Sequence, residues 1–133
     1  MAQLTTLSLT DRASTPVTHV FKPYGINPRD GVATLIEPGT APVGDSRFTI
    51  RGRKVGSRWK QSIRLVVPVV QTQVINGIST PVVVRRARAS VEFEFDDSSS
   101  AQERKDIVGM TMDSLGASKA LVNSVLIDLE GTW

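Results

Sequence analysis

The sequence contains no cysteine among its 133 residues and only one histidine. Disulfide bonds, thiolate metal sites and cysteine nucleophiles are therefore excluded. Nucleophile–base pairs and metal clusters are also scarce, because one isolated histidine has no second histidine or cysteine to act with. We expect a protein that is not an enzyme and that uses no cofactor and no metal.

Long apolar runs are missing as well. No segment approaches the roughly 18 consecutive apolar residues that a membrane-spanning helix needs. The first residues, MAQLTTLSLTDR, lack the basic start and apolar run of a signal peptide. The length suits one domain, residues 1–133. We therefore expect a single cytosolic domain with no membrane partner.

Acidic residues are absent between Asp45 and Glu92, an interval that holds ten lysines and arginines. From Glu92 to the C-terminus the balance reverses, with nine acidic and three basic residues. This segregation, which the net charge of +3 conceals, indicates an anionic partner on one surface. The alternative is a solvated face, although such faces usually interleave both signs of charge.

Alternation of polar and apolar residues predicts a run of β-strands. A hairpin is expected in residues 1–24 and a main sheet in residues 31–96. The predicted strands are 4–10, 18–22, 31–37, 47–53, 60–70 and 82–95. In the last three, basic residues recur at alternate positions: Arg47, Arg51 and Arg53, then Lys60 and Arg64, then Arg86 and Arg88. If these strands are antiparallel neighbours, the sheet has one basic face and one apolar face.

The C-terminal part, residues 100–131, changes to helical spacing. Ser100 and Glu103 form a capping box, and Gly116 is the expected C-cap of this first helix. Ser118 is the expected cap of a second helix, whose apolar stripe is Leu121, Val122, Val125, Leu126 and Leu129. The pattern predicts an α+β fold. Two short helices are too few to cover such a sheet, so a second copy of the chain is expected to complete it.

Several isolated features are explained by structure alone, without a functional role. Asn76-Gly77 predicts a type I′ hairpin turn. His19 is interpreted as an exposed strand residue without a partner, and the acidic stretch 92–97 as solvated carboxylates rather than a cation site. Trp59 lies at a hairpin, where it is either a base-stacking residue or simply an exposed aromatic.

The strings FKPYGINPRDGVATLIEPG, SRFTI and RLVVPVVQTQVINGISTPVVV, followed by the two-helix tail, resemble coat proteins of single-stranded RNA bacteriophages, the leviviruses. The resemblance runs in order along essentially the whole chain. It implies an N-terminal hairpin, a five-stranded antiparallel sheet and two C-terminal helices that interlock in a homodimer. It further implies a T=3 icosahedral shell, assembled in the bacterial host cytoplasm, whose inner face binds genomic RNA. Binding of an operator-type RNA stem-loop would repress translation of the replicase.

The resemblance also implies roles for particular residues. Adenine pockets fall on Val32, Thr49, Arg51, Ser62 and Arg64, and contacts to the RNA backbone fall on Arg47, Arg53 and Lys60. The family's frequent stacking tyrosine and neighbouring asparagine correspond to Arg88 and Ser90. Arg51 replaces a small hydroxyl residue, so the sequence predicts RNA binding with an altered choice of hairpin. The loop around the five-fold and six-fold axes corresponds to Gln71, Asn76, Gly77 and Pro81.

From composition and charge alone, a non-viral dimeric module that binds nucleic acid through its sheet remains the alternative to a coat protein. The size of the purified protein separates the two, because a shell has megadalton mass and a module remains a small dimer.

Overall fold

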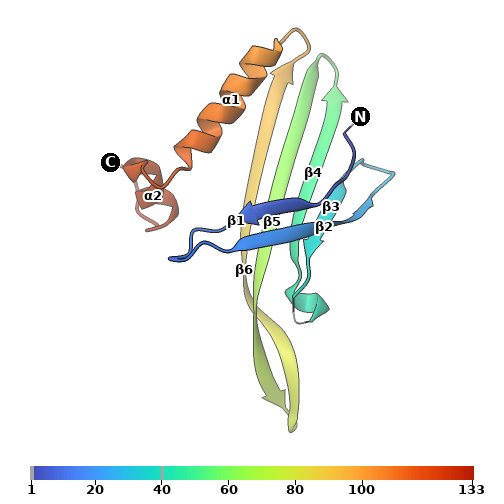
Figure 1. The fold of residues 1–133 in the computed structure, drawn as a ribbon, viewed down its shortest axis with the longest axis vertical. Coiled ribbons are helices and arrows are strands. Elements are labelled where there is room, and N and C mark those ends of the chain that lie inside the picture. Colours follow the sequence, from blue (N-terminus) through green and yellow to red (C-terminus); the bar gives the residue numbers. More distant parts are fainter. Residues whose placement is uncertain (1, 40) are drawn as a thin grey trace. The chain divides into compact units, whose positions relative to one another are not determined.

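The computed structural model describes residues 2–39 and 41–133. The chain forms two compact units, residues 1–94 and residues 95–133. The first unit is dominated by a sheet whose strands are neighbours in chain order (Figure 1). A short 3₁₀ helix, η1 (Pro42–Gly44), precedes the fourth strand. The strands are β1 (Leu7–Thr10), β2 (Thr18–Ile26), β3 (Ala33–Glu37), β4 (Ser46–Val55), β5 (Arg58–Ile75) and β6 (Ile78–Asp96).

The predicted α+β fold of a sheet followed by two helices is confirmed, but the hairpin is not separate from the sheet. Strand β2 was expected to end at residue 22, before the proline and glycine that follow. Instead it continues to Ile26 and pairs with β3, which makes a six-stranded sheet in place of five strands and a detached hairpin. The register shifts between Pro23 and Gly25. This irregularity accommodates the proline, which has no N–H to donate, without ending the pairing.

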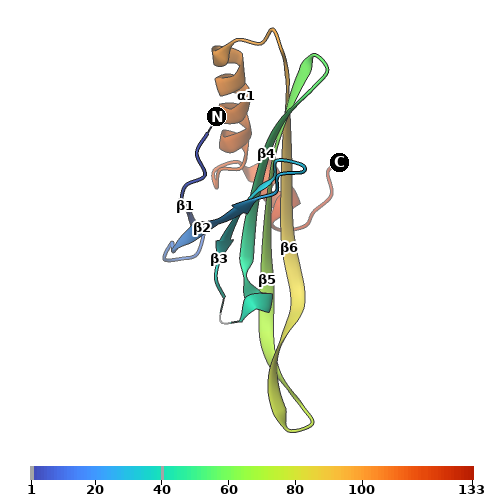
Figure 2. The same cartoon turned by 90° about the vertical axis from the view of Figure 1, so that its right-hand side faces the viewer.

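The hairpin of β1 and β2 lies across one face of the long strands. Figure 2 shows it on one side of the layer formed by β4 and β5. Phe21 of β2 and Leu35 of β3 are each 3% exposed, and the Phe21 ring centroid lies 6.3 Å from that of Phe48. Leu35 and Leu65 are both register partners of Phe48. Burial of such side chains stabilises by roughly 1.5–3 kcal/mol each, so the small core of the first unit lies beneath the hairpin.

His19 of β2 is not the solitary residue that the sequence suggested. Its Nε2 lies 2.8 Å from Asp11 Oδ2, and its Nδ1 lies 2.9 Å from Glu37 Oε1. The prediction failed because the two carboxylates come from the β1–β2 turn and the end of β3. His19 therefore connects the hairpin to the main sheet.

The turn between β5 and β6 is the predicted one. Asn76 and Gly77 have φ angles of +53° and +78°, as both central residues of a type I′ turn require. Gln71 lies in β5 and Pro81 in β6, so the segment expected to be a loop is a long two-stranded extension that ends in a two-residue turn.

The second unit contains helices α1 (Ala101–Ser114) and α2 (Ala120–Leu126). The capping box is confirmed, because Ser100 accepts a hydrogen bond from the Glu103 N–H and Glu103 accepts one from the Ser100 N–H. The C-cap of α1 is Leu115, one residue before the predicted Gly116. Neither helix is long and apolar enough to cross a membrane.

The prediction for the start and the length of α2 was wrong. Lys119 is the N-cap and makes no side-chain cap, so Ser118 does not cap the helix. The Asn123 side chain instead donates to the carbonyl oxygens of Gly116 and Lys119, at 2.8 and 2.7 Å. Leu129 lies beyond the helix with a φ of +58°, so the apolar stripe continues past the last helical turn.

Candidate nucleic-acid interface

The register between β4 and β5 places the basic residues on one face of the sheet. Directly opposed residues in an antiparallel pair point to the same side. Thr49 lies opposite Arg64, and Arg51 opposite Ser62. Arg53 and Lys60 are also opposed, further along the same two strands. The cationic row of β4 therefore joins that of β5, as the alternation in the sequence predicts.

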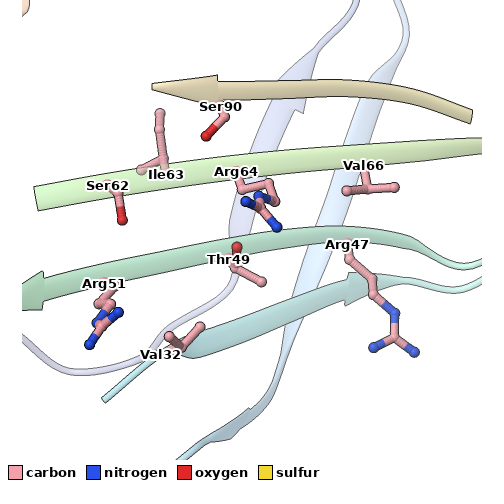
Figure 3. Close-up of a pocket in the computed structure, with 9 residues that line it drawn as sticks. All are labelled: Val32, Arg47, Thr49, Arg51, Ser62, Ile63, Arg64, Val66 and Ser90. Atoms are coloured by element: carbon pink, nitrogen blue, oxygen red, sulfur yellow. The ribbon is translucent and has the colours of Figure 1, made fainter. Parts of the chain in front are cut away.

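This face contains an open depression of about 460 Å³ (Figure 3). Seven of the ten residues singled out as RNA-binding line it: Val32, Arg47, Thr49, Arg51, Ser62, Arg64 and Ser90. In Figure 3 the Arg64 guanidinium points toward β4, whereas Arg47 extends away from the centre. The remaining three, Arg53, Lys60 and Arg88, lie outside its lining, and Arg88 borders a different depression with Arg85 and Arg86.

The depression presents hydrogen-bond donors, and no carboxylate in its described lining competes with a ligand for them. No aspartate or glutamate is among the described residues that line it. Arg64 is exposed, and the Nε atom of Arg51 is buried with no hydrogen-bond partner in the described part of the chain. An unsatisfied buried donor costs free energy until an acceptor reaches it. Arginine donors suit phosphate oxygens and base acceptors, so an anionic or base-bearing ligand fits this chemistry.

Strand β6 continues the same face. Ser90 lines the depression together with Ser62 and Arg64. Further along, Arg58 Nη1 donates to Glu94 Oε1 at 2.7 Å, and this hydrogen bond lowers the pKa of Glu94. Arg88 lies two residues before Ser90 in the strand, so its side chain is directed to the same side.

The opposite face is mainly apolar and carries Trp59. Trp59 lies opposite Lys54 in the register, and the Lys54 ammonium is 5.6 Å from the centroid of the indole ring. The hairpin covers part of this side through Phe21. Trp59 is therefore not on the face of the arginines, and its position does not support base stacking there. Counting alternate residues from Lys60 would have assigned it to this side.

Two residues that line the depression were not among the candidates. Val66 is the register partner of Arg47, and Ile63 neighbours Ser62 and Arg64 in β5. The alternation that selected Ser62 and Arg64 could have identified Val66, because it is the next residue of the same row. Ile63 pairs with Ile50 of the apolar row, and the sequence pattern gives no signal that it borders the depression.

Comparison with known proteins identifies the family of this chain. The family model described as levivirus coat protein matches residues 2–133. The capsid protein of Pseudomonas phage PRR1 is 46% identical over 133 residues, which are 99% of this chain and all of the relative. The capsid protein of Escherichia virus Qbeta is 33% identical over 114 residues, 81% of each chain.

Solved structures show the same fold. The virus-like particle of bacteriophage ESE058 matches with a TM-score of 0.86 at 19% identity, covering 99% of this chain and all of the other. The capsid protein of bacteriophage GA matches with a TM-score of 0.82 at 23% identity, covering 98% of each chain.

Proposed function

Because this chain belongs to the levivirus coat protein family, it is a structural capsid protein and not an enzyme, and we propose that it assembles as homodimers into a T=3 icosahedral shell around single-stranded RNA. The basic depression on the sheet is the observation that supports the RNA part of this proposal. Dimers would present this face to the inside of the virion, where the genome lies.

Contacts to phosphate supply affinity in this proposal. Arg47, Arg53 and Lys60 are placed along one face, where each lysine or arginine that meets a phosphate releases condensed counterions. Such contacts position the RNA but do not read its sequence. Specificity for a stem-loop comes from unpaired bases in the depression formed by Val32, Thr49, Arg51, Ser62 and Arg64. A stem-loop at the replicase start would then be held, and translation repressed.

Arginines at two of these positions alter the proposed recognition. Arg51 lies opposite Ser62, and its planar guanidinium can stack on a base or donate to one. Arg88 and Ser90, where the family commonly has tyrosine and asparagine, offer a second guanidinium beside a small hydroxyl. We propose that this chain selects a hairpin different from that of its relatives.

Exposed apolar surface supports the dimer. Among the described residues, Phe21 and Leu35 are the only apolar residues that are buried, each with 3% of its surface exposed. In the second unit, Leu121 is 71% exposed and Leu129 85% exposed. An isolated chain would leave these side chains in water, whereas interlocking with a second copy would bury them. Obligate dimers often have no stable folded monomer, so dilution should not release a native-like monomer.

The tip of the β5–β6 extension is the proposed contact around the five-fold and six-fold axes. Val74 is 71% exposed and Ile78 68% exposed beside the Asn76-Gly77 turn. The extension includes the remaining predicted axis residues, Gln71 and Pro81. A projecting hairpin with an apolar tip suits contacts between dimers rather than contacts within one.

Two measurements test the proposal. Electron microscopy of the protein expressed alone should show closed particles, and a population of small dimers would contradict the shell. Titration of an RNA hairpin at several salt concentrations tests the basic face. The variant carrying both Arg64→Ala and Arg88→Ala should bind more weakly with a shallower salt dependence. Unchanged affinity and an unchanged slope would show that this face does not bind RNA.

A further inference from the structure

The β5–β6 extension carries no charged side chain. Between Arg64 and Arg85 the sequence contains no lysine, arginine, aspartate, glutamate or histidine. The turn at its tip consists of Asn76 and Gly77, and every residue from 71 to 79 is exposed. A carboxylate created in this turn would therefore be the only charge on the extension.

An asparagine followed by glycine can convert its own side chain. The Gly77 nitrogen bonds to the side-chain carbonyl carbon of Asn76, and its proton leaves with the amide nitrogen as ammonia, so that a five-membered succinimide ring forms. Water then opens the ring at either carbonyl and gives aspartate or isoaspartate. Water is the only co-reactant. Glycine favours the ring closure, because it has no Cβ to shield the attacking nitrogen.

The structure leaves both reacting groups free to react. In a two-residue hairpin the flanking residues exchange the hydrogen bonds that close the turn, so the ladder does not use the Gly77 N–H. Within the described part of the chain, neither this N–H nor the Asn76 side chain makes a hydrogen bond. Apart from its own chain neighbours, Gly77 has no heavy atom within 4 Å of the position where a Cβ would stand. Water therefore has open access to the turn.

Ring closure requires Asn76 to leave its left-handed conformation, with its φ of +53°, and this opens the turn. The tip lies at the far end of the long extension (Figure 1). The flanking residues Ile75 and Ile78 are 51% and 68% exposed. Local opening costs least free energy where few buried contacts hold a segment. The tip can therefore open while the rest of the sheet stays folded.

The two other asparagines of the chain are protected from the same reaction. Asn27 precedes Pro28, whose nitrogen carries no hydrogen to lose. Asn123 lies inside α2, and its side chain donates to the carbonyl oxygens of Gly116 and Lys119. The chain thus supplies internal controls for Asn76.

We propose that Asn76 is a site of spontaneous deamidation, which turns the neutral tip of the β5–β6 extension into a negatively charged one as the protein ages. Isoaspartate also routes the backbone through the side-chain Cβ, which lengthens the turn. The consequence for assembly rests on the proposed function. Where the tips of several dimers gather around one axis, their new carboxylates repel one another. Aged dimers should therefore form closed particles less readily than fresh dimers.

Mass spectrometry of the full-length protein tests the modification. After incubation at mildly alkaline pH and brief digestion with pepsin at acidic pH, peptides containing Asn76 should gain about one dalton, because a hydroxyl replaces an amino group. They should also divide into two chromatographic peaks of equal mass, for aspartate and isoaspartate. Peptides containing Asn27 or Asn123 should keep their mass, and Asn76→Gly should abolish the gain.

The rate gives a second readout. Conversion at Asn76 should be about tenfold faster at pH 8 than at pH 7, because the nitrogen attacks in its deprotonated form. Conversion at Asn76 that is no faster than at Asn123 would overturn the proposed site.

Assembly is measured separately by electron microscopy. Asn76→Asp carries the charge of the product from the start, and aspartate tolerates the left-handed conformation of the turn. This variant should form fewer closed particles than the fresh protein, whereas Asn76→Gly should form as many. Equal assembly of Asn76→Asp would overturn the consequence for assembly. Failure of the fresh protein to form particles would instead overturn the proposed function, and the mass gain at Asn76 would still decide the modification.

Discussion

Arg53 and Lys54 are adjacent in β4 but lie on opposite faces of the sheet, because their register partners are Lys60 and Trp59. They carry the same charge and differ mainly in direction. They therefore form a matched pair for testing which face binds RNA. Arg53→Ala should weaken binding of an RNA hairpin and reduce the salt slope by about one if it contacts a phosphate.

Lys54→Ala removes the same charge from the other face and should leave both affinity and slope nearly unchanged. Filter binding over a range of salt concentrations measures both quantities. Equal losses of affinity in the two variants would mean that RNA binding depends only on the net charge of the protein. A larger loss for Lys54→Ala would mean that the other face binds RNA.

The His19 cluster predicts a pH dependence of stability. Hydrogen bonds to Asp11 and Glu37 raise the pKa of His19 above its ordinary 6.5. The contribution of protonated His19 to the stability of the fold is therefore complete below pH 6.5 and is lost as pH rises through the raised pKa. Hydrogen bonds from the Val17 N–H and from His19 lower the pKa of Asp11 from 3.8 to about 2. The contribution of ionised Asp11 to the stability of the fold is complete above pH 3.8 and is lost as pH falls through the lowered pKa.

The thermal midpoint should therefore decline on both sides of the interval from pH 3.8 to pH 6.5. Because His19 is the only histidine, His19→Gln should remove the decline just above that interval and leave the acid side largely in place. Scanning calorimetry at fixed protein concentration checks this. A variant that keeps the alkaline decline would show that His19 is not its source.

The core beneath the hairpin gives a prediction of stability. Phe21→Ala removes a ring that is 3% exposed and lies against Phe48, so it should destabilise the fold by about 3–5 kcal/mol. Ile50→Ala is the control on the same face of the sheet, because Ile50 is 44% exposed and should cost clearly less. Urea unfolding at equal protein concentration compares them. Similar losses would mean that the hairpin does not form the centre of the core.

Local patterns predicted the parts of this molecule that depend on local geometry. Alternation identified the face of Arg51 and Arg64, because strand side chains alternate whatever the strand pairs with. Asn76-Gly77 identified its turn, since few residue pairs tolerate two positive φ angles. Features that join distant segments were missed. His19 meets carboxylates 8 and 18 positions away, and β2 continues past Pro23 because β3 lies beside it.

The β5–β6 extension should be needed for shells but not for dimers. Deleting Val74, Ile75, Ile78 and Ser79 removes two residues from each strand and keeps the Asn76-Gly77 turn. Removing an even number from each strand preserves the direction of every remaining side chain. The deletion should leave the dimer folded, because the core at Phe21 and Leu35 belongs to the hairpin and β3. It should impair closed particles, because the exposed apolar tip is gone.

Size-exclusion chromatography and electron microscopy distinguish these outcomes. The matched control is Asn76→Gly, which keeps the length and the positive φ of the turn and should assemble normally. Full-sized particles from the shortened chain would show that the tip takes no part in closing the shell. Loss of the dimer itself would show that the extension is needed for the subunit to fold stably. The assignment of this hairpin to contacts at the symmetry axes would then have to be abandoned.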